Sequence, residues 1–274
     1  MEIKGWRYYN HAATPNHSPH ITPNLLPLKD KSIWKLDGFP LLARWTEEFD
    51  CGYETGWWYV IKDTPFDMSE LKAKRRYEIN KGIKNFEVKR IDPKEHKEEI
   101  YQIQLKAYAD YPSKYRPTVD RERLFDEIDR WEFSPVYGAF YKETGEMLGY
   151  AGLNDYGEYI SYSVHKVVPE YEKLSINAAI VHGILEDQKA FLASGGYLSD
   201  GARNMLHETK FQDYLEKYFG FRKAYGKLRI QYRPLVGLAV KLLFPFKKVL
   251  YKMDGNSMVN KINGILKMEE IARL

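Results

Sequence analysis

Cysteine is almost missing from this chain: Cys51 is the only one among 274 residues, so no disulfide can form within the chain. The CxxC and HExxH spacings of common zinc sites are also missing, and we therefore expect no metal centre. We interpret Cys51 as a small buried hydrophobe, with a nucleophile as the alternative.

Long apolar runs are missing as well. No segment approaches the roughly 20 apolar residues that a membrane-spanning helix needs, and the N-terminal MEIKGWRYYNH has no apolar run of signal-peptide length. We therefore expect a cytoplasmic protein. Charge of one sign is scarce too, because 42 basic and 38 acidic residues leave a net charge of +4. Such a balance does not by itself indicate a nucleic-acid-binding protein.

The patterns that are present divide the chain into four segments. Residues 1–32 are rich in Pro, Asn and His and predict an ordered, extended arm. Residues 33–134 predict strands at 39–49, 57–62 and 86–91 with helices at 67–81, 93–109 and 119–131. Residues 135–234 predict a meander of three strands, a buried helix at 171–193, and then strand, helix and strand. Residues 235–274 predict basic amphipathic helices. The expected fold is α+β, a mixed, mostly antiparallel sheet flanked by helices.

The segment from Gly196 to Pro234 carries the first candidate site. His207 and Glu208 fall in the first turn of a predicted helix, where unpaired backbone N–H groups favour anions and shift pKa values. They are candidate catalytic groups, or capping groups that follow Asn204. Asp200 ends the preceding strand, and it is either a third catalytic candidate or part of a turn. Tyr218 lies on the same helical stripe as His207 and is a candidate substrate contact.

The strand from Tyr159 to His165 alternates in polarity. Regular alternation places Tyr159, Ser161, Ser163 and His165 on one face, which predicts a polar face lining a cleft or facing solvent. We take His165 as a catalytic candidate and the other three as substrate contacts.

The run from Leu71 to Arg90 is the basic patch of the chain, with eight cations and two acids. On a helical wheel Arg75 falls on the apolar side and Arg76 at its edge. A buried arginine needs a partner, which is either an internal carboxylate or the phosphate or carboxylate of a substrate. We therefore predict substrate binding at Arg75 and Arg76.

The second half of the chain resembles the Gcn5-related N-acetyltransferase (GNAT) superfamily over residues 135–233. The resemblance is carried by the meander and by NMLHETKFQDYLEKYFGF, with Asn204, Gly220 and Phe221 in the places of the superfamily's Asn and Gly-Phe. The basic segment KAKRRYEINKGIKNFEV is similar to one in the Fem-type aminoacyl and peptidyl transferases. The strings WWYVIKD and KRRYEINKG are similar to segments of GNAT-like proteins from gut bacteria.

This resemblance implies an acyltransferase with an acyl-CoA donor. The superfamily's pyrophosphate signature would fall between Val167 and Ala178, but VVPEYEKLSINA has no glycine. Val167, Ser175 and Asn177 are the residues there that we predict to contact a cofactor. The general-acid tyrosine of many acetyltransferases would fall at Glu216, so no tyrosine is carried over.

Three functions remain open. The first is acyl transfer from acyl-CoA to an amine or hydroxyl of a small molecule or of a cell-envelope sugar precursor. The second is Fem-like transfer from aminoacyl-tRNA, with the basic patch on the phosphate backbone. The third is a non-catalytic, GNAT-like binding or assembly module. Residues 235–253 carry four lysines and no acid, and they pack on their own domain, form a homodimer, or lie on an anionic membrane surface.

Overall fold

The computed structural model describes residues 1–109, 111, 116–132, 134–204, 210–253 and 257–274. Its strands form a mixed, mostly antiparallel sheet in the order β1-β2-β3-β10-β4-β9-β8-β7-β6-β5, flanked by helices as expected. Residue contacts divide the chain into two compact units, each assembled from segments that are distant in the sequence. Unit 1 comprises residues 1–60, 202–210 and 223–274, and unit 2 comprises residues 61–201 and 211–222.

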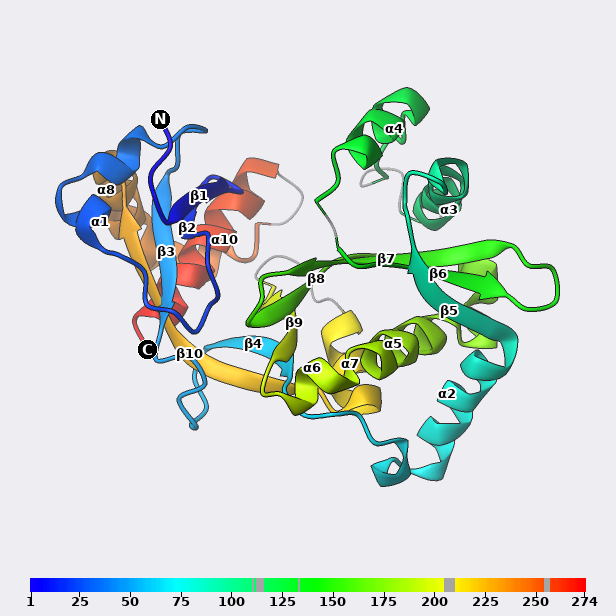
Figure 1. The fold of residues 1–274 in the computed structure, drawn as a ribbon. Coiled ribbons are helices and arrows are strands. Elements are labelled where there is room, and N and C mark those ends of the chain that lie inside the picture. The colour runs from blue at the N-terminus through cyan, green and yellow to red at the C-terminus, as the bar shows by residue number, and fades with distance from the viewer. Residues whose placement is uncertain (110, 112–115, 133, 205–209, 254–256) are drawn as a thin grey trace. The chain divides into compact units, whose positions relative to one another are not determined.

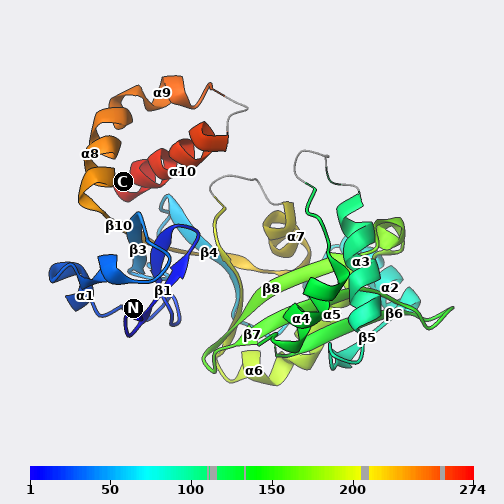
Figure 2. The ribbon, with the colours of Figure 1, turned by 90° about the horizontal axis from the view of Figure 1, so that it is seen from above.

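Unit 1 contains the chain ends. Its elements are β1 (Trp6–Tyr9), β2 (Ala12–Pro15), α1 (Leu26–Lys29), the 3-10 helix η1 (Ser32–Lys35), β3 (Leu42–Glu47), most of β4 (Trp57–Lys62) and β10 (Arg222–Tyr232), α8 (Pro234–Leu243), the 3-10 helix η5 (Phe244–Phe246), α9 (Lys247–Leu250) and α10 (Ser257–Ala272). The helices α8, α9 and α10 pack against one another (Figure 2). A small core under α1 and η1 includes Trp6, Leu28 and Ile33.

The first residues differ from the expected extended arm, because they form a hairpin. Asn10 and His11 both have positive φ, 47° and 63°, and they join β1 to β2 with Tyr9 opposite Ala12. A two-residue turn with both φ values positive matches the twist of the strands it connects. β2 then pairs in parallel with β3.

Unit 2 contains the meander. Its elements are the 3-10 helix η2 (Met68–Glu70), α2 (Ala73–Asn85), β5 (Phe86–Ile91), α3 (Lys97–Ala109), α4 (Arg121–Asp129), β6 (Val136–Tyr141), β7 (Met147–Asp155), β8 (Tyr159–Val167), the 3-10 helix η4 (Pro169–Leu174), α5 (Ile176–Asp187), α6 (Lys189–Ala193), β9 (Tyr197–Ala202) and α7 (Lys210–Phe219). β5 to β8 form an antiparallel meander, and β9 joins β8 in parallel.

Helices cover both faces of the meander. α5 packs on β5, β6 and β7, and α3 packs on β7 and β8 from the other face (Figure 1). α5 buries seven of its residues, among them Ile176, Ile180 and Ile184, which confirms the prediction of a buried helix. That helix was predicted as one piece from 171 to 193, but Ser175 has a φ of 64° and separates η4 from α5. α5 therefore begins beside the end of β8.

Candidate active site

The sheet of unit 2 opens between two neighbouring parallel strands. Among the described residues, β8 and β9 pair only over Tyr159–Ser161 opposite Tyr197–Ser199, although β8 continues to Val167. Beyond this point the two strands part, with Asp200 on β9 and Tyr162 on β8. An opening at the carboxyl ends of parallel strands is where α/β sheets commonly bind ligands. We refer to this opening as the splay.

A β-bulge brings Tyr162 and His165 to the same face of β8. On β7, Leu153 lies opposite Tyr162 and Gly152 lies opposite Val164, so Ser163 is an extra residue on β8. An inserted residue reverses the alternation of every side chain beyond it. The prediction that Tyr159, Ser161, Ser163 and His165 share one face is therefore wrong. Tyr162, which the regular alternation placed on the opposite face, is the residue that this prediction missed.

Phe211 of α7 confirms which side chains meet. Its ring centre lies 5.0 Å from that of His165 and 6.1 Å from that of Tyr162. The ring of Tyr214 follows 6.1 Å from Phe211, and that of Tyr218 lies 4.9 Å from Tyr214. Positions three and four residues apart lie on one helical face, so Phe211, Tyr214 and Tyr218 form an aromatic stripe on α7 that leads away from His165.

A chain of hydrogen bonds orients the imidazole of His165. The side-chain nitrogen of Asn177 donates to Oε1 of Glu172 at 3.4 Å, and the amide oxygen Oδ1 of Asn177 lies 2.9 Å from Nε2 of His165. Because an amide oxygen only accepts, Nε2 must carry the hydrogen and Nδ1 must carry the lone pair. Nδ1 is buried and has no hydrogen-bond partner among the described residues. Burial lowers the pKa of His165 to about 4, so at neutral pH the imidazole is neutral and Nδ1 carries a lone pair.

The hydroxyl of Tyr162 is the second buried group without a partner among the described residues. Burial, and next the charge of Asp200, raise the pKa of Tyr162 well above its ordinary value. The phenol therefore stays protonated at neutral pH and can donate a hydrogen bond. A neutral donor and a neutral acceptor on one strand face suit a reaction that moves a proton while negative charge develops on oxygen.

Asp200 is a partly buried carboxyl group at the splay. Burial raises its pKa to about 7, and a hydrogen bond from Gln212 acts in the opposite direction. The amide of Gln212 also donates to the backbone oxygen of Asp200 at 3.3 Å. A carboxyl group with a pKa near the working pH is well matched to proton transfer, so Asp200 stays a candidate.

The raised pKa of Asp200 should make the free energy of unfolding depend on pH. The native state holds this proton up to about pH 7, whereas the unfolded chain releases it near pH 4. Stability that is present below pH 4 is therefore lost as the pH rises to 7. We expect Asp200→Asn, which does not titrate, to be more stable than wild type by up to about 4 kcal/mol at pH 8 and nearly equal at pH 4.

Urea unfolding at both pH values measures this difference. Asp213→Asn, an exposed carboxylate of α7, is the control, and it should change the free energy of unfolding by less than about 0.5 kcal/mol. A variant at Asp200 with the same pH dependence as wild type would rule out a raised pKa.

Comparison with known proteins shows which solved structures have a similar fold. No protein-family model and no curated protein matches the chain. Among solved structures, L-PGS from Bacillus licheniformis is similar over 98% of this chain and 85% of its own, with a TM-score of 0.56 and 14% identity. The C-terminal domain (DUF2156) assigned to a lysylphosphatidylglycerol synthetase from Agrobacterium fabrum covers 86% and 82%, with a TM-score of 0.52 and 10% identity. A tandem GNAT protein from the clavulanic acid biosynthesis pathway covers 81% and 75%, at a TM-score of 0.42 and 11% identity.

The fold is GNAT-like: its mixed, mostly antiparallel sheet flanked by helices is shared with L-PGS and with the DUF2156 domain. The resemblance inferred from the sequence is thus confirmed at the level of the fold. The resemblance implies that the pyrophosphate of acyl-CoA would bind at the start of the helix after the meander, which is α5.

The residues at the start of α5 do not fit a pyrophosphate. The hydroxyl of Ser175 donates to the carboxylate of Glu78 at 3.0 Å, and Asn177 is held between Glu172 and His165. Two carboxylates therefore occupy the helix end that an anion would need, and they would repel it. Val167, the third residue predicted to contact a cofactor, is 7% exposed. Asn177 thus orients His165 and Ser175 bonds to Glu78, and their contact with a cofactor stays a prediction.

The predicted arginines have partners within unit 2. Arg75 donates to the backbone oxygen of Lys217 and lies 5.5 Å from the ring centre of Tyr218. Arg76 donates to the backbone oxygen of Leu71 at 2.5 Å. Among the described residues Arg75 thus contacts a carbonyl group and an aromatic ring and not an internal carboxylate, and substrate binding by Arg75 and Arg76 stays a prediction.

The remaining predicted residues are dispersed. Tyr159 is stacked between Tyr156 and Tyr197, at 4.8 and 5.4 Å, and the hydroxyl of Ser161 donates to the backbone oxygen of Tyr162 at 3.4 Å. Ser163 is exposed at the bulge. His207 and Glu208 lie outside the described residues. Within the described ranges, no group of three or more His, Cys, Asp or Glu side chains is placed to hold a metal ion.

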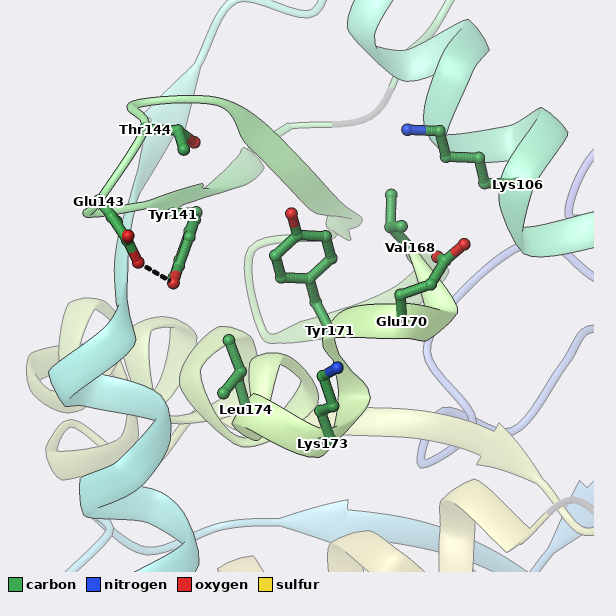
Figure 3. Close-up of a pocket in the computed structure, with 9 residues that line it drawn as sticks. All are labelled: Lys106, Tyr141, Glu143, Thr144, Val168, Glu170, Tyr171, Lys173 and Leu174. Carbon is green, nitrogen blue, oxygen red and sulfur yellow. Dashed lines mark hydrogen bonds between the residues drawn. The ribbon is translucent and has the colours of Figure 1, made fainter.

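A shallow hollow of about 590 Å³ lies on η4, apart from the splay. Tyr171 stands in its middle and faces Tyr141, whose hydroxyl donates to Glu143 (Figure 3). Lys106 and Lys173 face it together with Glu143 and Glu170. Its lining is mixed in charge, and among the described residues it includes neither His165, Tyr162 nor Asp200.

Proposed function

We propose that this protein is an acyltransferase that moves an acyl or aminoacyl group from an ester donor to an amine or hydroxyl. The observation that carries the proposal is the buried, unprotonated Nδ1 of His165 on the same strand face as the neutral hydroxyl of Tyr162. The GNAT-like fold, and the likeness to L-PGS over 98% of the chain, support it.

The reaction follows from these groups. Nδ1 of His165 takes the proton of the acceptor N–H or O–H as the new bond to the acyl carbon forms. The hydroxyl of Tyr162 donates to the oxyanion that develops on that carbon. The bond between the acyl carbon and the donor's ester oxygen then breaks, and His165 returns the proton to that oxygen. Asp200 accepts a hydrogen bond from an ammonium group of the acceptor or of the aminoacyl group.

An aminoacyl-tRNA is the ester donor that these surroundings favour over acyl-CoA. Carboxylates at the start of α5 disfavour a pyrophosphate, whereas the half-buried ring of Tyr218 lies beside Arg75. Aromatic rings stack on unpaired bases, and cations bind the phosphate backbone. The basic patch of α2 supplies further cations, among them exposed Lys72, Lys74 and Lys84. The acceptor is a small molecule or a cell-envelope precursor with an amine or hydroxyl.

Donor choice is tested by binding and transfer. We expect isothermal titration with acetyl-CoA and with CoA to give no heat of binding. Aminoacyl-tRNA carrying a radiolabelled amino acid should bind, and its label should pass to acceptors in a cell extract. If three phosphates are contacted, affinity should fall about 20-fold between 50 and 200 mM salt.

Two outcomes would contradict the donor assignment. Micromolar binding of acetyl-CoA would indicate that acyl-CoA is the donor. An affinity for tRNA that does not change with salt would rule out aminoacyl-tRNA as the donor. If neither donor bound, a non-catalytic binding or assembly module would replace both.

A further inference from the structure

The segment α8–η5–α9 exposes an unusual amount of apolar surface. The described residues include 18 large hydrophobic side chains classed as exposed, and six of them lie between residues 235 and 253. Each of the six is more than half exposed: Leu235, Leu238, Leu242, Phe246, Val249 and Met253. The three leucines lie on one stripe of α8 because they are spaced by three and four residues. Contiguous exposed apolar surface of this kind marks an interaction site.

An apolar groove continues this surface. Helices α8 and α10 enclose about 310 Å³ between aliphatic side chains only, with Leu235 and Val236 on one side and Ile262 and Ile265 on the other. Leu235 belongs to both features, since it lines the groove and is 81% exposed. The groove and the stripe therefore form one continuous apolar surface.

Residues 234–253 contribute cations and no acids to this surface. Residues 234–253 contain Lys241, Lys247, Lys248 and Lys252 and no Asp or Glu. Lys247 pairs with Glu270 at 2.7 Å. No ion pair between described residues involves Lys241, Lys248 or Lys252, and all three are exposed. Apolar side chains bordered by unpaired lysines match the boundary between the phosphate groups and the acyl chains of an anionic bilayer.

We propose that α8–η5–α9 is the surface by which this protein lies on an anionic membrane. The six apolar side chains enter the acyl boundary, and Lys241, Lys248 and Lys252 lie at the lipid phosphates. A second copy of the chain is the less suitable occupant, because a two-fold contact would bring together two copies of a segment that has lysines and no acid. Within the described residues no helix is long and apolar enough to cross a bilayer, so the segment lies on the surface.

Sedimentation with vesicles tests this proposal on the full chain without any donor, so its result is independent of the proposed reaction. We expect binding to vesicles of phosphatidylcholine with 30% phosphatidylglycerol, and at least about tenfold weaker binding to pure phosphatidylcholine or in 0.5 M salt. The double substitution Leu238→Glu and Leu242→Glu should weaken binding more than about tenfold. Lys248→Glu should weaken it by about fivefold or more.

Leu26→Glu is the matched control. Leu26 is an exposed leucine of unit 1, 60% exposed on α1, and its substitution should leave vesicle binding within about twofold. Circular dichroism and thermal unfolding show that each variant is folded. Equal binding to the two kinds of vesicle would overturn the role of the lysines. A dimer in sedimentation equilibrium that the double substitution abolishes, together with no vesicle binding, would overturn the proposal in favour of a second copy.

Discussion

Replacing His165 with alanine is expected to lower the rate of transfer by about 100- to 1,000-fold while donor affinity stays within about twofold. The substitution removes Nδ1, the buried lone pair without a partner among the described residues, and it leaves the aromatic stripe of α7 in place. A group that acts on the proton in the transition state affects the rate and not the binding of the ground state. Single-turnover transfer at saturating donor, alongside a separate binding titration, measures both quantities.

Two further variants distinguish proton transfer from a structural role. Ser163→Ala changes the exposed bulge residue of the same strand and should leave the rate within about twofold. Asn177→Asp places a carboxylate at Nε2, where Asn177 now accepts at 2.9 Å. A nearby negative charge favours the imidazolium, so the pKa of His165, followed by NMR, should move upward from about 4. A His165→Ala variant with more than half of the wild-type rate would rule out this role.

Hydropathy patterns predicted the strands well where burial alternates or is continuous. Two strands, Trp57–Lys62 and Phe86–Ile91, have the predicted bounds, and the meander and the buried helix are present. These patterns follow from which side chains must leave water, and that information is local. The α+β fold class could therefore be predicted from these patterns, whereas the GNAT-like fold was implied by the resemblance of residues 135–233.

The chemistry of the site could not be predicted in the same way. The bulge at Ser163 depends on how β7 and β8 pair, and no residue of YISYSVHK indicates it. Without the bulge, regular alternation would place Tyr162 and His165 on opposite faces of β8. The bonds from Glu172 through Asn177 to His165 join η4, α5 and β8, and the sequence indicates only that polar residues occur there. His165 and Asp200 could be selected as candidates, but their state of protonation depends on burial.

The role of Gly82 could not be predicted from the sequence either, and its substitution gives the largest loss of stability that we expect. The sequence pattern predicted that it ends a helix, because glycine is a frequent helix terminator. In the structure α2 continues through Gly82 to Asn85, and Gly82 is buried against the start of α5. A Cβ atom at this position would lie 2.5 Å from the backbone oxygen of Ser175 and 2.9 Å from the backbone nitrogen of Ala179. The glycine is needed for the close approach of two helices.

Gly82→Ala should therefore lower the free energy of unfolding, by about 2 to 4 kcal/mol, although alanine favours a helix over glycine by about 1 kcal/mol. Backbone atoms are the contacts, so the two helices must separate. Because Asn177 lies in the first turn of α5, that shift also misplaces the partner of His165, and transfer should slow more than stability alone explains. Urea unfolding and single-turnover transfer on the same preparation measure the two effects.

Gly237→Ala is the control for helix propensity. Gly237 lies in α8, and there a Cβ atom would approach only the Cβ of Tyr232, at 3.2 Å. Its substitution should change the free energy of unfolding by less than about 1 kcal/mol in either direction. If Gly82→Ala were as stable as Gly237→Ala, the close contact between α2 and α5 would be absent. The carboxylate of Glu78 would then not be held at the start of α5, and the argument against acyl-CoA would lose its physical basis.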